Sequence, residues 1–212
     1  MHVVFTPRQS LIESDTTMLS SRFDEALAFA CDLHRAQVRK GGSVPYISHL
    51  LAVAALVMED GGSEEEAIAA LLHDSIEDQS ASYPGGRDGL RQEIERKFGS
   101  AVLEIVNACT DDDHHGKPEW RARKQAYLDH IPHASPRARR VSCADKLHNA
   151  RTVLADYRKI GNALWQRFRT RNGGDQIWYF TELARAFKET GTGPMAEELG
   201  RVLTELRREC GI

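Results

Sequence analysis

The sequence predicts an all-α protein that folds as one bundle of about eight to ten helices. Apolar residues recur at spacings of three and four along most of the 212 residues, and no alternating run is long enough to indicate a strand. Glycine, proline and polar clusters interrupt this pattern at intervals that suit short helices. We therefore expect residues 20–212 to form a single domain, preceded by an irregular leader over residues 1–19.

The first helix is expected to begin at Ser21, with Asp24 completing a capping box. It would run to about Arg39 and stop at the glycine pair 41–42. Pro45 is well placed to open the second helix, because its missing N–H falls in the first turn, where no partner is needed.

The third helix has the clearest start signal in the chain. The second helix would end at the glycine pair 61–62, and Ser63 with Glu66 then forms a capping box. This third helix would extend through Asp78, followed by a turn-rich loop over residues 83–89. The remaining helices are expected at residues 90–98, 100–108, 119–130, 136–159, 176–189 and 195–208.

Charge and cysteine usage narrow the class of protein. A net charge of -3 provides no overall basic footprint for nucleic acid, and the basic clusters at 121–124 and 137–140 are read as solvated helix faces rather than anion contacts. The longest apolar run, residues 50–58, is too short to cross a bilayer. Widely spaced cysteines without a C-x-x-C pair favour buried free thiols and a cytoplasmic location. They are Cys31, Cys109, Cys143 and Cys210.

The stretch LLHDSIEDQ, residues 71–79, concentrates ionisable groups on an otherwise apolar segment. On a helix, His73 and Glu77 would be one turn apart, as would Asp74 and Asp78, so all four would lie on adjoining stripes. Such groups are costly to bury without partners, and a divalent cation would be a suitable one. A metal site and an amphipathic helix with a charged border both fit this segment.

Two further segments carry similar residue types. His49 could be a satisfied core histidine, and Asp145 could be half of an ion pair with Lys146 or Arg151. Asn149 is one turn beyond Asp145, so their side chains would share a helix face. With the His-Asp pair at 73–74, these segments offer two histidines and two aspartates on three helices, an incomplete octahedral shell.

The motifs RKGGSVPYISH, LLHDSIED and ADKLHNAR, in this order, resemble the hydrolase domain of RelA/SpoT-type proteins. The resemblance runs from about residue 23 to residue 187 and is greatest to the small alarmone hydrolases of the HD phosphohydrolase superfamily. It implies an HD-type helical bundle that hydrolyses the 3′-diphosphate of guanosine tetra- or pentaphosphate, giving GDP or GTP and pyrophosphate. The expected partner is therefore a nucleotide, and neither nucleic acid nor a membrane.

The resemblance also implies roles for individual residues. A single divalent metal, expected to be Mn²⁺, would be held by His49, His73, Asp74 and Asp145. The catalytic residues would be Glu77 and Asp78, which position or deprotonate the attacking water, and Asn149, which helps to hold water or phosphate. The nucleotide and its diphosphate would contact Arg39, Lys40 and Tyr179. The arginine-lysine pair has an alternative reading as a basic C-terminal cap of the first helix.

Several positions depart from the family pattern. Leu50 follows the motif histidine where the family often has proline, and the loop 110–118 is longer and more acidic, which leaves nucleotide selectivity open. Residues 113–115 spell the signature of an unrelated phosphoesterase family, but that family needs acidic motifs after β-strands, and none is found. The histidines that match no expected ligand position are His34, His114, His115, His130, His133 and His148.

Two other functions remain open on the sequence. A related HD phosphohydrolase, such as an NADPH 2′-phosphatase, would use the same metal centre with a different pocket. A non-catalytic nucleotide sensor could share the same helices. The presence of Glu77 and Asp78 speaks against a sensor, because binding alone needs no acids that activate water.

Overall fold

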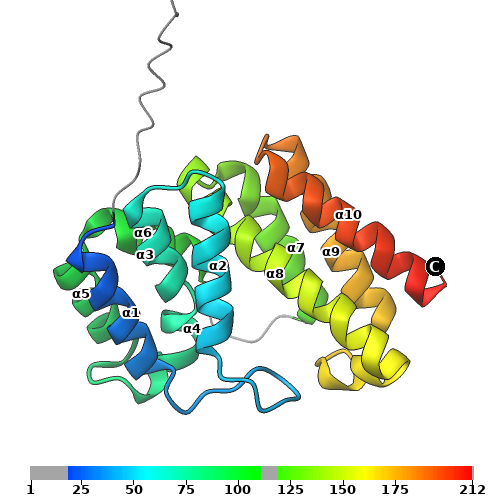
Figure 1. Ribbon diagram of the computed structural model, residues 1–212, viewed down its shortest axis with the longest axis horizontal. Coiled ribbons are helices and arrows are strands. Elements are labelled where there is room, and N and C mark those ends of the chain that lie inside the picture. The colour runs from blue at the N-terminus through cyan, green and yellow to red at the C-terminus, as the bar shows by residue number, and fades with distance from the viewer. Residues whose placement is uncertain (1–18, 111–118, 212) are drawn as a thin grey trace, which may run out of the picture.

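The computed structural model describes residues 19–110 and 119–211, which form an all-helical bundle (Figure 1). These residues contain ten α-helices and three 3₁₀ helices, which confirms the predicted class and number of helices. Within them, the isolated bridge between Val38 and Pro45 is the only β pairing. Residues 1–18 of the expected leader and residues 111–118 of the expected loop lie outside the described residues.

The α-helices are α1 (Ser21–Leu33), α2 (Ile47–Glu59), α3 (Glu64–Leu72), α4 (Ser75–Gln79), α5 (Gly86–Phe98), α6 (Ser100–Cys109), α7 (Trp120–His130), α8 (Pro136–Ile160), α9 (Gly173–Glu189) and α10 (Pro194–Cys210). The 3₁₀ helices are η1 (Ser80–Ser82), η2 (Ile131–His133) and η3 (Gly161–Arg167).

Helix α8 is the central element of the molecule. Its 25 residues pack against α2, α3 and α6 on one side and against α9 and α10 on the other. Figure 1 accordingly shows α1 to α6 in one half of the molecule and α9 and α10 in the other, with α8 between them. A side chain on the inner face of α8 therefore meets residues from the first half of the chain.

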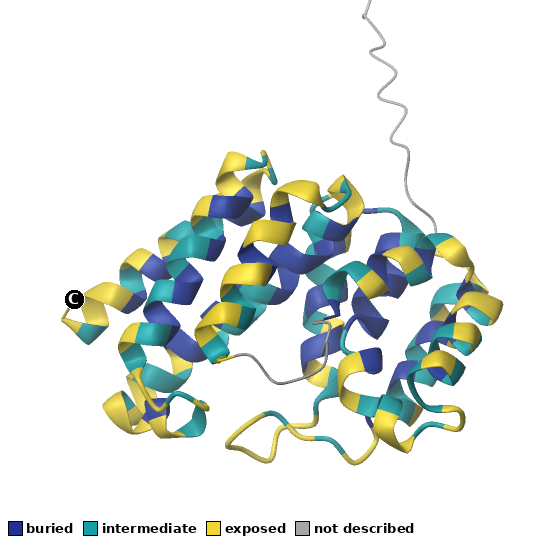
Figure 2. Cartoon of the chain, turned by 180° about the vertical axis from the view of Figure 1, so that it is seen from behind, coloured by how far each residue is buried: buried dark blue, intermediate teal, exposed yellow. Residues whose placement is uncertain are grey.

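Helix α3 forms the core of the first half. Residues 67–72, which include Ile68, Leu71 and Leu72, are fully inaccessible to solvent, because α1, α2 and α6 pack around this short helix. The buried residues of the other helices face inward in the same way (Figure 2). His73 therefore enters the site from the end of a helix that is fixed on several sides.

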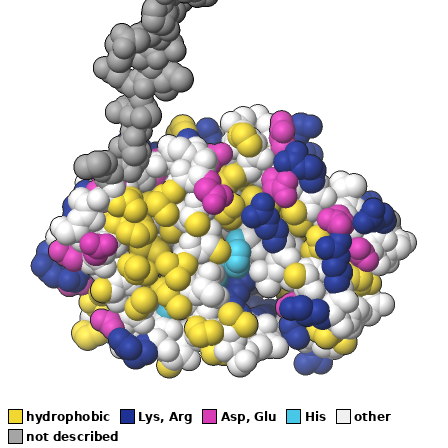
Figure 3. Space-filling model, viewed as in Figure 1, with side chains coloured by type: hydrophobic (Ala, Val, Ile, Leu, Met, Phe, Trp, Pro, Cys, Tyr) yellow, Lys and Arg dark blue, Asp and Glu magenta, His cyan; other side chains and the backbone are white. Residues whose placement is uncertain are grey.

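The surface of α2 is unusually apolar. The helix has no Lys, Arg, Asp or Glu from Ile47 through Met58, and Leu51 and Met58 are exposed. Figure 3 shows hydrophobic side chains gathered over the α1–α3 half of this face, whereas Lys and Arg are more frequent over the α8–α10 half. On this face, basic side chains are thus more frequent on one half of a protein whose net charge is negative.

Two predicted helix starts are confirmed. The Ser63 side chain accepts a hydrogen bond from the Glu66 N–H, and the Glu66 carboxylate accepts one from the Ser63 N–H, which completes the capping box. Pro136 occupies the first position of α8, and the side chain of Ser135 caps that helix by accepting from the Ala138 N–H.

The first helix begins at Ser21, as predicted, but its predicted cap and its predicted end are wrong. Its N-cap is Ser20, whose hydroxyl accepts from the Arg22 N–H, and the helix ends at Leu33. The following residues leave the helix because their backbone groups pair across a hairpin, with the Arg39 N–H bonded to the Val44 carbonyl at 2.8 Å. Arg39 therefore does not cap α1, and that alternative reading of the basic pair is excluded.

The third predicted helix is interrupted at its most important point. Helix α3 ends at Leu72, and α4 begins only at Ser75, with His73 and Asp74 between them. Local propensity does not signal this break, because the sequence around it contains neither glycine nor proline. Both residues keep right-handed helical dihedrals, with φ and ψ of -59° and -32° at His73 and of -95° and -3° at Asp74, so the interruption is slight.

Two other boundaries also differ from the prediction. Helix α2 begins at Ile47, because Pro45 belongs to the hairpin bridge instead of the first helical turn. Helix α5 begins at Gly86, inside the stretch predicted to be a loop, where Gly85 has a φ of 77° and can enter the helix from the left-handed region.

The capping box provides a test of local stability. Ser63→Ala removes the acceptor for the Glu66 N–H, and we expect it to lower the free energy of unfolding by about 1 kcal/mol. Urea denaturation followed by circular dichroism would measure the loss, with exposed Ser43→Ala as the control. Equal stability of the two variants would show that the box contributes nothing.

Candidate metal centre

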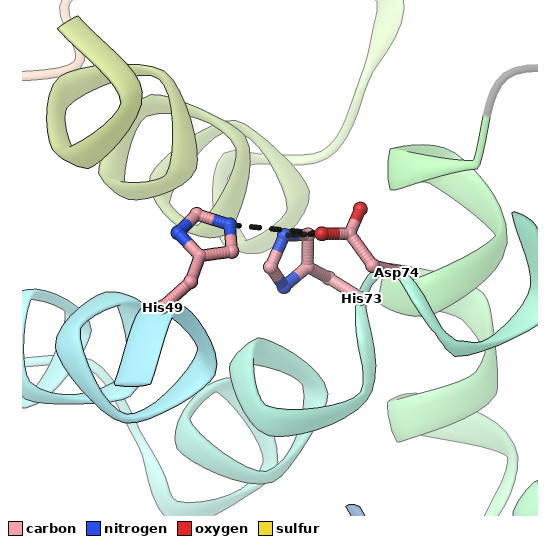
Figure 4. A group of neighbouring side chains, drawn as sticks. All are labelled: His49, His73 and Asp74. Carbon is pink, nitrogen blue, oxygen red and sulfur yellow. Dashed lines mark ion pairs between the residues drawn. The ribbon is translucent and has the colours of Figure 1, made fainter. Parts of the chain in front are cut away.

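Four ionisable side chains converge from three segments of the chain. His49 lies on α2, His73 and Asp74 lie at the break between α3 and α4, and Asp145 lies on α8. Asp145 Oδ1 is 3.2 Å from His49 Nε2 and 3.7 Å from His73 Nε2. Asp74 Oδ2 is 3.6 Å and 3.0 Å from the same two nitrogens (Figure 4). The sequence-predicted ligands are thus brought together.

The two Nε2 atoms lack ordinary hydrogen bonds. Both are buried, and neither makes a well-aligned hydrogen bond to any atom of residues 19–110 and 119–211, although the carboxylates are near. His49 is therefore not the satisfied core histidine that the sequence left open. Buried polar atoms without partners are costly, and in a native site they point to a missing ligand.

The opposite ring nitrogens hold the imidazoles in the orientation that a cation needs. His73 Nδ1 is 2.8 Å from the Ala70 carbonyl oxygen, so this nitrogen carries the proton and donates it. His49 Nδ1 is 2.7 Å from His148 Nδ1, where one ring donates and the other accepts. When His49 is the donor, both Nε2 lone pairs are directed to the shared centre, as in metal-binding histidines with outer hydrogen-bond partners.

The electrostatic field of the cluster favours a positive charge. Burial by itself lowers the pKa of His73, but the carboxylates of Asp74 and Asp145 outweigh it and raise that pKa well above its usual value. Burial likewise opposes ionisation of both aspartates. Neighbouring imidazoles, and for Asp145 first of all the Lys146 ammonium, nevertheless hold their pKa values well below the usual range.

These residues fit a divalent metal ion. One ligand atom from each of His49, His73 and Asp74 lies within 4.8 Å of the others, and Asp145 adds a second carboxylate oxygen. Neighbouring ligands of a six-coordinate ion lie about 3 Å apart when each is about 2.1 Å from the metal. Two imidazoles and two carboxylates form a mixed N/O set that suits first-row divalent ions.

The two oxygens of Asp145 also connect the cluster to a basic group and an amide group. Lys146 Nζ lies 2.6 Å from Asp145 Oδ2, so the predicted ion pair exists alongside the contact with the histidines. Asn149 donates to Asp145 Oδ1 at 2.5 Å and accepts from Arg39 at 2.7 Å. Arg39 is thereby attached to the cluster through one intervening side chain.

A polar pocket of about 200 Å³ opens beside these groups. Its walls carry both acidic and basic side chains. They are formed by Arg39, Tyr46, Asp74, Glu77, Asp78, Cys109, Lys124, Tyr127, Asp145, Lys146 and Asn149. The pocket is smaller than the roughly 300–1,000 Å³ of typical ligand sites, so it suits the polar end of a ligand better than a whole nucleotide.

The predicted acidic pair lies on the pocket wall. Glu77 and Asp78 belong to the short helix α4 and are exposed. Gln37 donates to Asp78 Oδ2 at 2.7 Å, which ties this carboxylate to the hairpin after α1. Partial burial and the nearby Asp74 charge raise the pKa of Asp78, so this group exchanges protons closer to neutrality than an ordinary aspartate.

Two predicted substrate contacts are not part of this wall. Lys40 Nζ lies 5.6 Å from the centre of the Phe168 ring, outside the lining residues. Tyr179 is buried, and Lys124, which does line the pocket, lies over its ring at 5.1 Å. The structure therefore places Tyr179 behind Lys124, and the nucleotide contacts of both residues remain predictions.

Several contributors were not identified from sequence. Tyr46 donates to Asp74 Oδ2 at 2.5 Å, and its place three residues before His49 is a signal that could have found it. Lys124 belongs to a cluster read as a solvated helix face, a reading that is wrong for this residue. Lys146 was expected only as an ion-pair partner of Asp145 and not as part of a pocket wall. His148 adjoins Asn149, but consecutive helical positions point in different directions, so spacing did not indicate it.

Comparison with known proteins agrees with this site. A family model described as an HD domain matches residues 26–174, which contain all four clustered side chains. The chain belongs to the HD-domain family. An HD domain implies a divalent-metal site, in accord with the cluster of His49, His73 and Asp74.

Named relatives within the HD-domain family are similar over much of the chain. Guanosine-3′,5′-bis(diphosphate) 3′-pyrophosphohydrolase MESH1 of Mus musculus is 34% identical over 86% of this chain and 93% of its own. The Xenopus tropicalis protein of the same name is 41% identical over 61% of this chain and 68% of its own. The solved structure of a metazoan ortholog of SpoT that hydrolyses ppGpp superposes with a TM-score of 0.66. It is 26% identical and covers 92% of this chain and 98% of its own.

Two further properties of the HD domain concern membrane spans and cysteine chemistry. None of the helices in the described ranges combines the length and apolar character that a membrane span requires. All four cysteines are free, and burial raises the pKa of the Cys109 thiol on the pocket wall to about 11, so it stays protonated near neutral pH.

Metal binding should weaken as the pH falls. Because the pKa of His73 is raised, a bound metal must displace a proton over the neutral range, so affinity should fall by up to about tenfold per pH unit below that pKa. Calorimetric titration with Mn²⁺ between pH 8 and pH 6, in buffers of different ionisation enthalpy, would measure affinity and proton release. A Mn²⁺ affinity that stays constant between pH 8 and pH 6 would contradict the expected displacement of a proton from His73.

Proposed function

We propose that this HD-domain protein hydrolyses the 3′-diphosphate of guanosine tetra- or pentaphosphate, with Mn²⁺ as its metal and GDP or GTP plus pyrophosphate as products. The observation that carries the proposal is the convergence of His49, His73, Asp74 and Asp145 beside a pocket whose wall also holds Glu77. The MESH1 relatives, which are named for this activity, support the substrate.

The basic groups of the pocket are suited to a diphosphate. Arg39, Lys124 and Lys146 line a volume too small for a whole nucleotide, so we infer that the diphosphate end enters and the nucleoside stays at the mouth. Arg39 offers a planar fork for phosphoryl oxygens, while the lysines act as point charges. Positioning and charge neutralisation of this kind account for most of the catalysis of phosphoryl transfer.

Glu77 is the proposed general base. It lines the pocket in the first turn of α4, close in sequence to Asp74, and can accept a proton from the attacking water. Asp78, with its raised pKa and its hydrogen bond from Gln37, is suited to pass protons onward. Asn149, fixed between Asp145 and Arg39, would orient water or a phosphoryl oxygen. A divalent metal, when bound, polarises a phosphoryl oxygen and makes water a sufficient nucleophile near neutral pH.

A cellular location and two further nucleotide contacts are proposed as well. We expect the protein to act in the cytoplasm, where its four cysteines would stay reduced. We expect Lys40 and Tyr179 to contribute to nucleotide binding, although neither belongs to the pocket wall.

Product analysis tests the reaction directly. Purified protein incubated with guanosine tetraphosphate and Mn²⁺ should release GDP and pyrophosphate, detected by ion-exchange chromatography, and chelator should stop this release. Turnover of NADPH with no turnover of guanosine tetraphosphate would identify the alternative phosphohydrolase. Tight nucleotide binding without turnover in any divalent metal would identify a sensor.

Substitution separates the base from the metal ligands. Glu77→Gln should keep the fold and the metal affinity but lower kcat by about 10²–10⁴-fold, because a positioned base contributes about that much. Asp145→Ala should abolish Mn²⁺ binding itself, as measured by calorimetry. The matched control is Glu104→Gln, which changes an exposed side chain on α6 and for which we expect wild-type kcat. Full activity of Glu77→Gln would refute the assignment of the base.

A further inference from the structure

The hairpin between α1 and α2 carries Arg39 and Lys40 but is mostly exposed. Its two sides are joined by backbone hydrogen bonds from Arg39 N–H to the Val44 carbonyl and from Tyr46 N–H to the Gln37 carbonyl, at 2.8 and 2.9 Å. Two such bonds form only a short ladder, and isolated hairpins are marginally stable in water. The position of its tip therefore depends on contacts with the rest of the molecule.

One such contact is unusually close. Gly41, at the hairpin tip, has a φ of 76°, and the side chain of Arg167 lies directly across it. A Cβ atom at Gly41 would be 2.3 Å from Arg167 Cδ and 2.5 Å from Arg167 Nε. A Cβ atom there would force the arginine side chain to shift, so the hairpin backbone and the arginine are packed against each other.

Arg167 is in turn held by α8. Its Nη1 atom lies 2.9 Å from Asp156 Oδ2, and both side chains are largely shielded from solvent. The next residue, Phe168, presents its ring to the Lys40 ammonium at 5.6 Å. The last residue of η3 and the residue after it thus contact the hairpin at two consecutive positions, Gly41 and Lys40.

The same helix holds the hairpin at a second place. Arg39 donates to Asn149 on α8, two turns before Asp156. Lys159, by contrast, lies 3.9 Å from Asp156 and is exposed. Of these two cations beside Asp156, Arg167 is the one whose side chain lies across Gly41.

We propose that Arg167 is a positioning residue, which fixes the hairpin tip against the end of α8 and so holds Arg39 and Lys40 at the pocket mouth. This inference rests on the proposed function, because substrate binding by the basic pair is part of that proposal. Arg167 is not among the residues lining the pocket, so it acts through the hairpin and not by touching the diphosphate. Misplacement of binding groups by about 1 Å is enough to cost large factors in catalysis.

The test is a steady-state comparison of three variants with guanosine tetraphosphate. Arg167→Ala should raise KM by roughly tenfold, with kcat changed less than about twofold and Mn²⁺ affinity unchanged. Arg167→Lys, which keeps the aliphatic stem and the charge opposite Asp156, should restore most of the affinity. Lys159→Ala removes the other cation near Asp156 and should match the wild type. Unchanged KM in Arg167→Ala, or an equal effect of Lys159→Ala, would overturn the inference.

A double substitution tests whether the contact itself matters. Gly41→Ala should raise KM in the wild type, and it should add less in the Arg167→Ala background, because the side chain it would strike is gone. Fully additive effects would show that Gly41 acts through its backbone conformation alone and would refute the packing contact.

Hydrogen exchange separates this inference from the proposed reaction. The Arg39 and Tyr46 amides should exchange faster in Arg167→Ala than in Lys159→Ala or the wild type, whatever the substrate proves to be. Faster exchange in a protein inactive on guanosine tetraphosphate would leave the contact in place and refute only the reaction. Unchanged exchange would refute the positioning role even if the enzyme is active.

Discussion

The buried meeting of His49, His73, Asp74 and Asp145 is the interaction around which the chain is arranged. Four ionisable groups can share one largely dry site only when opposite charges and hydrogen bonds compensate their desolvation. The four groups come from α2, from the break after α3 and from α8, so the site exists only when these elements are packed together. Packing of α8 against α2 and α3 is therefore both a core contact and the assembly of the centre.

The break between α3 and α4 follows from the same requirement. In a regular helix, the side chains of consecutive residues point about 100° apart and do not face each other. His73 Nε2 and Asp74 Oδ2 nevertheless lie 3.0 Å apart at the point where α3 ends and before α4 begins. Asp74 is also the N-cap residue of α4, yet its side chain makes no capping bond, because it is directed to the cluster and to Tyr46. The Asp74 side chain therefore contributes to the site instead of capping α4.

The pocket and the centre are mechanically connected. Tyr46 bonds to Asp74, and Asn149 bonds to both Asp145 and Arg39, so groups that line the pocket also orient the clustered carboxylates. Occupation of the centre and binding of an anionic ligand should therefore reinforce each other through shared hydrogen bonds. The basic lining also shows that net charge is a poor guide to ligand class, since a chain of charge -3 presents several cations in one pocket.

The sequence by itself determined the all-α class, most helix positions and the residues of the centre. Helical periodicity, the Ser63–Glu66 capping box and Pro136 are local signals, and local physics decides helices of this kind. Spacing alone left His49 and Asp145 open to ordinary structural readings, and the ordered motifs supplied the rest. Tertiary structure decided the end of α1, the break at His73 and Asp74, and the recruitment of Lys124, Lys146 and His148. These depend on contacts between residues far apart in the chain, whose burial and electrostatic free energies outweigh helix propensity, and a pattern within one segment cannot register them.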